Sequence, residues 1–294
     1  MTRVLIKRPP WLKKRLIQNS VLAGTRTILS EERIHTVCES SICPNQNECF
    51  ANSRATFLLL GDACTRGCAF CSAKRASAKG FVDEDEPRRI LDAIRRLGLR
   101  YVVITSVTRD DLEDGGAWHF AKAIGVIKKY SRSIKVEVLI PDFKGDRKSI
   151  ERVVEASPDV FGHNIETVER LYRRVRAGAD YNRSLGLLRY VKEVKPDQLT
   201  KSSIMVGLGE ETEEVFSAMK DMREAGCDIL TIGQYLKSRH DNLPVSKYVP
   251  PQEFGRYRET ALKLGFRSVI SGPFVRSSYL AEEAYNETIR GRAP

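Results

Sequence analysis

The stretch TFLLLGDACTRGCAFC, residues 56–71, joins a short apolar run to three closely spaced cysteines. The run Thr56–Gly61 ends in glycine, which is typical of a buried strand. Cys64, Cys68 and Cys71 follow it with CxxxCxxC spacing. Three thiolates in one loop can bind three irons of an iron–sulfur cube, whereas a cluster that only carries electrons normally has four cysteines. One iron would therefore stay open to bind another molecule.

Beyond Arg54 the sequence alternates between strand-like and helix-like segments. Six apolar runs predict strands at 56–61, 100–105, 135–140, 159–163, 202–207 and 228–232. Amphipathic segments predict helices at 85–98, 116–130, 146–156, 168–176, 183–195 and 211–225. Strict alternation predicts a parallel sheet. Both a doubly wound open sheet and a six-stranded partial barrel fit this alternation.

Polar motifs after successive strands favour the barrel. They are the cysteine loop after the first strand, 106–116 after the second, 163–166 after the fourth, 207–210 after the fifth and 233–235 after the sixth. Sites that follow many strands share one rim of a barrel, whereas an open sheet has one crevice. We expect an α/β fold with a partial (β/α)6 TIM-type barrel at 56–265. An N-terminal arm at 1–55 and a C-terminal closing segment at 266–294 would complete one functional domain.

Charge and hydropathy limit the partners. The chain has 49 Lys and Arg against 38 Asp and Glu, a net charge of +11 and a pI of 9.3, which favours acidic partners. No apolar run approaches the roughly 18–20 residues of a membrane span. The first thirty residues are basic, but the prolines at 9–10 suit an ordered arm better than a targeting helix.

The seven cysteines fall into two triplets and a single residue. An odd count in a chain of this length argues against a disulfide scaffold. Cys227 precedes a strand-like run and is expected to be a small buried hydrophobe. The upstream triplet, Cys38, Cys43 and Cys49, again offers three thiols, and a zinc site completed by His35 remains an alternative. The CxxxCxxC triplet has no His or Cys within ten residues after it that would complete a zinc tetrahedron.

CxxxCxxC with Phe70 before its last cysteine resembles the signature of the radical S-adenosylmethionine (SAM) superfamily. The upstream CxxxxCxxxxxC and the ending Arg276-Ser277-Ser278-Tyr279 make the chain similar to the lipoyl synthase family. The likeness extends nearly end to end, through residues 10–12, 104–117, 163–167 and 205–210. One departure is Ser203, where the family pattern suggests glycine, and it puts only the local backbone fit in doubt.

The resemblance implies two [4Fe–4S] clusters and SAM as cofactors. Cys64, Cys68 and Cys71 would hold the cluster that cleaves SAM to a 5′-deoxyadenosyl radical. The upstream triplet would hold an auxiliary cluster that is itself the sulfur source. Ser277 would give that cluster an oxygen ligand, which is harder and more replaceable than a thiolate. Sulfur would enter carbons six and eight of a protein-bound octanoyl chain, giving dihydrolipoyl.

Further assignments come from short motifs with open alternatives. By resemblance, Asn164 and Glu166 would contact the SAM ribose, although a strand-end cap is an alternative. Gly115 and Gly116 would let the backbone approach the methionine end, or they are loop glycines before a helix. Gly207 and Gly209 could likewise be a turn. The basic run at Arg170, Arg173, Arg174 and Arg176 would dock an acidic carrier or form a solvated helix face.

The family implies partners and surroundings as well. The substrates would be octanoylated carrier domains, namely the E2 subunits of 2-oxoacid dehydrogenases and the glycine-cleavage H protein. The electron donor would be a ferredoxin or flavodoxin, and we expect a cytoplasmic monomer that binds neither nucleic acid nor membrane. Two rivals remain. One is another sulfur-inserting radical SAM enzyme, such as a methylthiotransferase acting on tRNA, and the other is a zinc-stabilised nucleic-acid-binding protein.

Overall fold

The main sheet of the molecule is a partial barrel of parallel strands. The computed structural model describes residues 7–76 and 81–291. Its strand order is β1-β4-β5-β6-β7-β8-β9, and each strand pairs in parallel with the next. The strands are β1 (Thr56–Leu59), β4 (Tyr101–Ser106), β5 (Lys135–Leu139), β6 (Val160–Gly162), β7 (Leu199–Val206), β8 (Ile229–Gln234) and β9 (Ser268–Gly272). The expected fold class is confirmed, with a seventh strand beyond the expected six.

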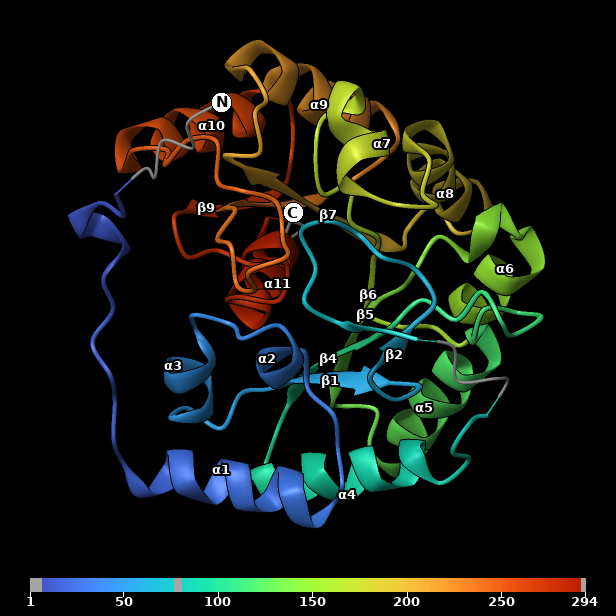
Figure 1. Ribbon diagram of the computed structural model, residues 1–294. Helices are drawn as coiled ribbons and strands as arrows, with labels where there is room; N and C mark the ends of the chain where they lie inside the picture. The colour runs from blue at the N-terminus through green and yellow to red at the C-terminus, as the bar shows by residue number, and fades with distance from the viewer. Residues whose placement is uncertain (1–6, 77–80, 292–294) are drawn as a thin grey trace.

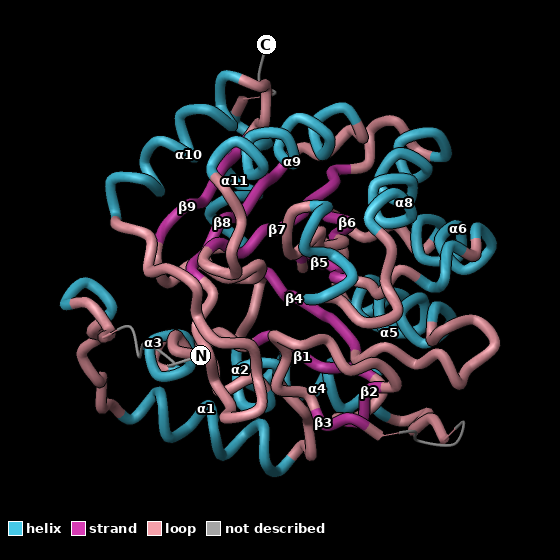
Figure 2. Tube along the Cα trace, turned by 45° about the horizontal axis from the view of Figure 1, so that its top comes forward, coloured by secondary structure: helices cyan, strands magenta, loops and turns pink. Residues whose placement is uncertain are grey.

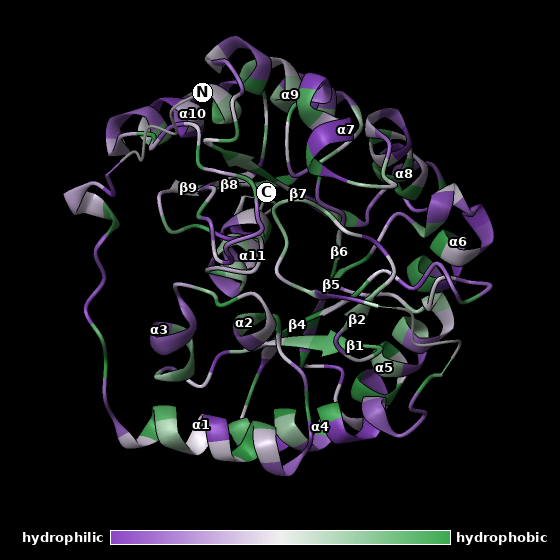
Figure 3. Cartoon of the chain, in the orientation of Figure 1, coloured by the Kyte–Doolittle hydropathy of each residue, from purple (hydrophilic) through white to green (hydrophobic). Residues whose placement is uncertain are grey.

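Helices cover the outside of this sheet (Figure 1). The main ones are α4 (Glu86–Leu97), α5 (Ala117–Tyr130), α6 (Arg147–Glu155), α8 (Tyr181–Val194), α9 (Thr212–Glu224) and α10 (Pro251–Lys263). The helix expected at 168–176 is instead a 3-10 turn, η3 (Glu169–Leu171), followed by the short α7 (Tyr172–Val175). Another 3-10 turn, η2 (Phe143–Gly145), follows β5. Figure 3 shows hydrophilic and hydrophobic surfaces alternating along these helices, as their amphipathic sequences require.

Helix α4 illustrates how the sequence builds this layer. Pro87 occupies its first turn, where a missing backbone N–H costs nothing. Ile90, Ala93 and Ile94 lie on one stripe and are buried. Arg95 and Arg96 lie in the last turn, where a positive charge interacts favourably with the helix dipole. The stripe packs toward the barrel, and α4 contacts both β1 and α5.

Strand β7 begins at Leu199, earlier than the expected residue 202. Thr200 and Lys201 look like loop residues in the sequence, but both are buried in the strand. Lys201 Nζ donates to Glu137 Oε1 at 2.7 Å, and the Tyr101 hydroxyl donates to Glu137 Oε2 at 2.6 Å. A buried charge is tolerated when it is paired and hydrogen-bonded in this way. The apolar pattern therefore predicted too short a strand, because Thr200 and Lys201 are polar residues whose burial depends on partners across the barrel.

The N-terminal arm and the C-terminal segment close the side and one end of the barrel. The N-terminal arm contributes η1 (Pro10–Leu12), α1 (Ser20–Glu31), α2 (Val37–Ser40) and α3 (Gln46–Phe50), and the C-terminal segment contributes α11 (Ala281–Arg290). Thr36 pairs antiparallel with Phe57 of β1, and α2 packs on the same strand. Figures 1 and 2 show α2 and α3 on the open side of the barrel, next to β1. Helix α11 packs on β8 and β9, and its Tyr285 clusters with the first residues of β6, β7 and β8, so α11 covers the amino end of the barrel.

Among residues 7–76 and 81–291, no helix combines the length and the apolar composition that crossing a membrane would require.

Candidate active site

The cysteine loop, residues 64–71, lies at the carboxyl end of β1, on the rim of the barrel. Cys64 ends the two-residue strand β2 (Ala63–Cys64), which pairs with β3 (Lys74–Arg75). Thr65 N donates to the carbonyl of Thr108 at 2.9 Å, in the loop after β4. Ala69 N donates to the carbonyl of Val175 at 2.9 Å, at the end of α7. The loop backbone is thus attached to neighbours on two sides of the rim.

Buried ion pairs add to this attachment. Arg66 Nε lies 2.7 Å from Asp110 Oδ2, and Arg66 Nη2 lies 2.7 Å from Asp142 Oδ1. Asp142 also pairs with Arg183 at 2.8 Å. Although burial acts to raise it, the hydrogen bond and charge of Arg66 hold the pKa of Asp142 well below its usual value. Asp142 therefore stays ionised near neutral pH and holds Arg66, and with it the loop, in place.

The loop after β8 forms hydrogen bonds with the cysteine loop on a third side. Asn242 Nδ2 donates to the Cys71 carbonyl at 2.9 Å, and Leu243 N donates to the Ala69 carbonyl at 3.0 Å. Ser72 and Ser238 also contact each other through their hydroxyls. Sequence pattern did not point to these residues, because a polar loop without periodicity does not indicate its tertiary contacts.

Asn164 and Glu166 lie together beside the rim, as expected of residues that act on one ligand. Asn164 Nδ2 donates to Glu166 Oε1 at 2.9 Å. Arg176 Nη1 donates to the Asn164 carbonyl at 2.7 Å, and its charge also acts on Cys68. Burial raises the pKa of Glu166 above its usual value, even though Arg176 and Asn164 act against this rise. The structure thus connects this pair to the cysteine loop through Arg176.

The basic run after β6 divides into two parts. Arg176 turns inward to these contacts, so it does not belong to a docking surface. Arg170, Arg173 and Arg174 are all exposed, and Arg170 pairs with Glu214 at 2.7 Å. Only these exposed arginines suit the expected contact with an acidic carrier. Since Arg176 lies two positions after Arg174, helical spacing could not separate its role from theirs.

His163, in the same motif as Asn164, is fully buried. Its Nδ1 lies 3.0 Å from the Ile140 carbonyl, and its Nε2 has no hydrogen-bond partner among the described residues. Burial, with the charge of Arg176, lowers the pKa of His163 to about 4, so the ring is neutral at physiological pH. Nδ1 then carries the proton donated to Ile140, which leaves Nε2 as an acceptor.

Gly115 and Gly116 precede α5 with positive φ angles of 61° and 93°. A Cβ on Gly116 would lie 2.3 Å from Leu60 Cδ1, and one on Gly115 would lie 2.8 Å from Phe143 Cδ1. Both glycines are therefore required by backbone conformation and packing. Their contact with SAM stays a prediction.

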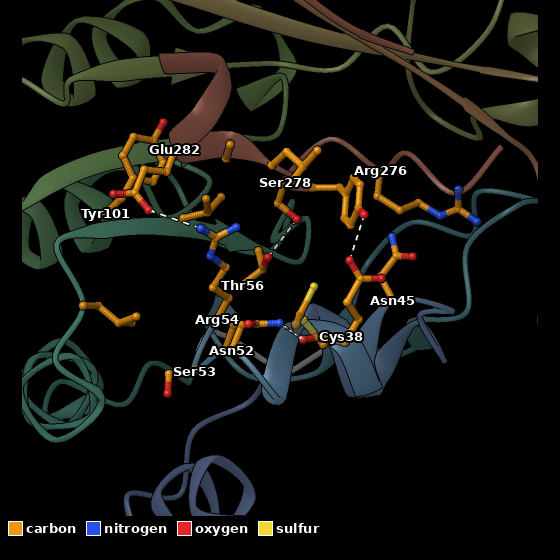
Figure 4. Close-up of a pocket in the computed structure, with 18 of the residues that line it drawn as sticks. Cys38, Asn45, Asn52, Ser53, Arg54, Thr56, Tyr101, Arg276, Ser278 and Glu282 are labelled. Atoms are coloured by element: carbon orange, nitrogen blue, oxygen red, sulfur yellow. Dashed lines mark hydrogen bonds and ion pairs between the residues drawn. The ribbon is translucent and has the colours of Figure 1, made fainter. Parts of the chain in front are cut away.

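The upstream triad, Cys38, Cys43 and Cys49, comes from the arm that fills the barrel opening. Cys38 lies in α2 and Cys49 in α3, and Cys43 N donates to the Cys38 carbonyl at 3.0 Å between them. All three line one pocket of about 360 Å³. Arg276 and Ser278 line the same pocket from the C-terminal segment (Figure 4). The arm and the C-terminal segment thus meet around the three thiols.

Lys14 joins these two segments. Its Nζ donates to Asn45 Oδ1 at 2.5 Å and to Glu48, and it lies 4.9 Å from the centre of the Phe274 ring and 5.4 Å from that of Tyr279. Asn45 Nδ2 donates to the Phe274 carbonyl at 2.6 Å, and the Tyr279 hydroxyl donates to Glu48 Oε1 at 2.9 Å. We call these five residues the Lys14 clamp. No pattern in the sequence points to this clamp, since Lys14 stands among other basic residues.

The two serines of the C-terminal motif differ in their surroundings. Ser278 lines the pocket, and its hydroxyl accepts a hydrogen bond from Thr56 Oγ1 at 2.8 Å (Figure 4). Ser277, the expected oxygen ligand, is next to it and partly exposed, but it is not among the lining residues. The role of Ser277 therefore stays a prediction that substitution of each serine can test.

The residues around the upstream triad fit an anionic iron–sulfur cluster. Burial raises the pKa of Cys38 to about 12 and that of Cys49 to about 11, so both thiols are protonated near neutral pH in the metal-free chain. Metal binding would release these protons, because the thiolate is the ligand. Lys14 and Arg54 act electrostatically on Cys49, and Cys43 and Arg276 act on each other. Three cations from separate segments thus offset the charge of thiolate ligands.

Within 7–76 and 81–291, no three His, Cys, Asp or Glu side chains, those of the two cysteine triads included, gather as they would around one metal ion. His35, the alternative zinc ligand, is exposed. Cys227 is fully buried against the core, which confirms the expected hydrophobic role.

The fold and the rim cysteines define a class of enzyme. Residues 58–222, more than half of the chain, match the radical SAM superfamily. The chain belongs to that superfamily. A lipoyl synthase from Caldanaerobacter subterraneus subsp. tengcongensis is 54% identical over 277 residues, covering 94% of this chain and 96% of the relative. One from Thermus thermophilus is 49% identical over 281 residues, covering 95% and 87%. Within the superfamily, the chain belongs to the lipoyl synthase family, whose members are sulfurtransferases that use SAM and two [4Fe–4S] clusters.

Solved structures support the fold alone. SuiB from Streptococcus suis, bound to its precursor peptide SuiA, aligns with a TM-score of 0.56 at 15% identity, over 77% of this chain and 50% of that one. HydG, a maturase of the [FeFe]-hydrogenase, aligns with a TM-score of 0.53 at 12% identity, over 92% and 75%.

Proposed function

We propose that this chain inserts sulfur at carbons six and eight of an octanoyl group carried on a lysine. The carriers are E2 subunits of 2-oxoacid dehydrogenases and the glycine-cleavage H protein. The observation that carries the proposal is the presence of two cysteine triads at one barrel, one on the rim and one in the opening, in a chain of the lipoyl synthase family. When bound, the clusters and SAM supply the radical and the sulfur.

The rim triad, Cys64, Cys68 and Cys71, holds the cluster to which SAM binds. Its loop is attached to three neighbouring loops, so it keeps the thiols in a fixed arrangement before the cofactor arrives. Asn164 and Glu166 bind the ribose hydroxyls through an amide and a carboxylate that already contact each other. Gly115 and Gly116 lie at the methionine end of SAM.

The upstream triad, with Ser277 as the fourth ligand, holds the auxiliary cluster. Serine oxygen is a harder ligand than thiolate and is more easily exchanged, which suits an iron that leaves during sulfur transfer. Arg276 lines the pocket of the upstream triad, and its charge interacts with those of Cys43 and Glu166. The Lys14 clamp keeps the arm against the C-terminal segment and limits the entry of water.

The proposed function also includes a carrier partner, an electron donor and a cellular location. Arg173 and Arg174 are exposed after β6 on the rim, where an acidic carrier domain would approach the octanoyl site. A ferredoxin or flavodoxin supplies the electrons. The chain acts as a monomer in the cytoplasm.

The test is anaerobic turnover of the reconstituted chain with an octanoylated carrier, SAM and a reductant. We expect the carrier to gain the mass of two sulfur atoms. The variant Cys38→Ala/Cys43→Ala/Cys49→Ala should still form 5′-deoxyadenosine, because its rim triad is intact, but should transfer no sulfur. Wild-type chain that forms 5′-deoxyadenosine without modifying the carrier would refute the proposal, and sulfur found on added tRNA instead would favour a methylthiotransferase.

A further inference from the structure

The pocket beside the upstream triad connects the thiols with solvent. Its walls include the three cysteines and, from the segments around them, Asn52, Arg54, Glu282 and Glu283. Figure 4 shows Arg54 and Glu282 on the side of the pocket away from Cys38. Cys38 is only 7% exposed, whereas the side chains of Arg54 and Glu283 are 45% and 44% exposed. The pocket therefore leads from a buried sulfur to a charged mouth on the surface.

This mouth lies at the end of the barrel opposite the rim. Thr56 and Tyr101, which begin β1 and β4, both line the pocket, whereas the cysteine loop follows the other end of β1. Parallel strands place all their amino ends on one face, so the mouth and the rim open on opposite faces. Arg276 lines the pocket beside the triad. The pocket therefore gives the triad an approach from the face opposite the rim.

We propose that this pocket is a rear entrance through which dissolved iron and sulfide reach the upstream triad. The inference rests on the proposed function, because a cluster that gives up its sulfur has to be rebuilt before the chain can act again. A volume of about 360 Å³ admits hydrated ions and small molecules but no folded carrier domain. The rear entrance leaves the rim to SAM and the octanoyl chain.

An ion pair crosses the mouth of the rear entrance. Arg54 Nη1 lies 2.7 Å from Glu283 Oε1, and Arg54 Nη2 lies 3.6 Å from Glu282 Oε2. Arg54 precedes β1 and both glutamates begin α11, so the pair connects the two edges of the barrel opening. Exposed pairs of this kind shift an open–closed equilibrium by about two- to fivefold. The mouth also offers carboxylates to an iron cation and a guanidinium to sulfide.

The test measures how fast a small bidentate chelator removes iron from the upstream triad. The full chain with Cys64→Ala/Cys68→Ala/Cys71→Ala, reconstituted anaerobically, carries its iron only there, and the two-cluster holoenzyme repeats the measurement by cluster spectroscopy. Glu283→Gln opens the mouth by breaking its shorter ion pair while it keeps the Arg54 charge that acts on Cys49, and Asn52→Trp narrows it. Glu31→Gln is the matched control, because Glu31 also pairs with an exposed arginine, Arg96, but does not line the pocket.

We expect Glu283→Gln to release iron about two- to fivefold faster than wild type, and Asn52→Trp to release it more slowly than wild type. Glu31→Gln should match wild type. If Asn52→Trp fails to load iron, Arg100→Trp narrows the same mouth from the β4 side. Equal release rates in the open and narrowed variants would overturn the rear entrance.

A second readout separates this inference from the proposed function. In a single turnover of preloaded holoenzyme, Asn52→Trp should modify as much octanoylated carrier as wild type, because the rim is unchanged. Its reloading with Fe²⁺ and sulfide after turnover should slow together with iron release. Absence of sulfur transfer in wild type would refute the proposed function alone, whereas normal transfer with unchanged reloading would refute the rear entrance alone.

Discussion

Lys14→Met should loosen the upstream triad without affecting the rim triad. The substitution keeps a side chain of similar length but removes the charge that contacts Asn45, Glu48 and two aromatic rings. A hydrogen bond between charged groups contributes about 1.5–3 kcal/mol, and each exposed cation–π contact contributes about 0.5–1 kcal/mol. Lys14 and Glu48 are 23% and 35% exposed, so solvent reduces these values. We take the loss as about 2 kcal/mol, which raises the population with an undocked arm roughly thirtyfold.

The assay is iron and acid-labile sulfide per chain after reconstitution and a desalting column. Wild type should retain about eight irons, and Lys14→Met should fall toward about four, since one cubane is lost. Reductive cleavage of SAM should continue at the wild-type rate, because the rim loop has no contact with the clamp. Lys13→Met is the control, since it removes the same charge from an exposed neighbour. Equal iron retention in the two variants would refute the role of the clamp.

Three other changes test individual groups. Ser277→Ala should abolish sulfur transfer, whereas Ser278→Ala should only weaken it, because the Ser278 hydroxyl accepts a hydrogen bond from Thr56. The reverse order in product assays would assign the ligand role to Ser278. Glu166→Gln should weaken SAM binding about tenfold with cluster content unchanged, as measured by calorimetry. Because the pKa of Asp142 is depressed, its ion pairs stabilise the fold above its usual pKa of 3.8, and this stability is lost as pH falls through the lower folded pKa. Asp142→Asn should therefore flatten the acid dependence of the melting temperature of the apoprotein.

The strands and the cysteine loops followed from local pattern. Apolar runs placed six of the seven strands of the main sheet, because parallel strands buried on both faces are continuously apolar. Strand β9 was missed, since Ser268–Gly272 has only Val269 and Ile270 as apolar residues and depends on β8 and α11 for its burial. The placement of the CxxxCxxC motif after β1 was equally local, and the structure keeps it.

Local sequence pattern could not predict the tertiary contacts that position the two cysteine triads. Lys14 meets Tyr279, and Asn242 meets Cys71, across separations in sequence that no periodicity describes. Arg176 shows the same limit from the other direction, because helical spacing grouped it with exposed arginines while its guanidinium turns to Asn164. Sequence pattern thus predicts strands, helices and closely spaced motifs, which depend on residues near one another along the chain. Which cation faces a ligand site depends on tertiary contacts.

The position of the C-terminal motif depends on a backbone contact. A Cβ on Gly233, in β8, would lie 2.0 Å from the Val275 carbonyl and 3.4 Å from Arg276 Nη1. Any side chain at 233 would therefore displace the turn that carries Arg276, Ser277 and Ser278. Because the sheet stops at β9, this turn can enter the opening that an eighth strand would fill in a complete barrel. The absence of an eighth strand in the sheet and of a side chain at Gly233 together allow the turn with Arg276, Ser277 and Ser278 to reach the upstream triad. A turn far along the chain can therefore contribute to a cluster site whose cysteines lie in the first fifty residues.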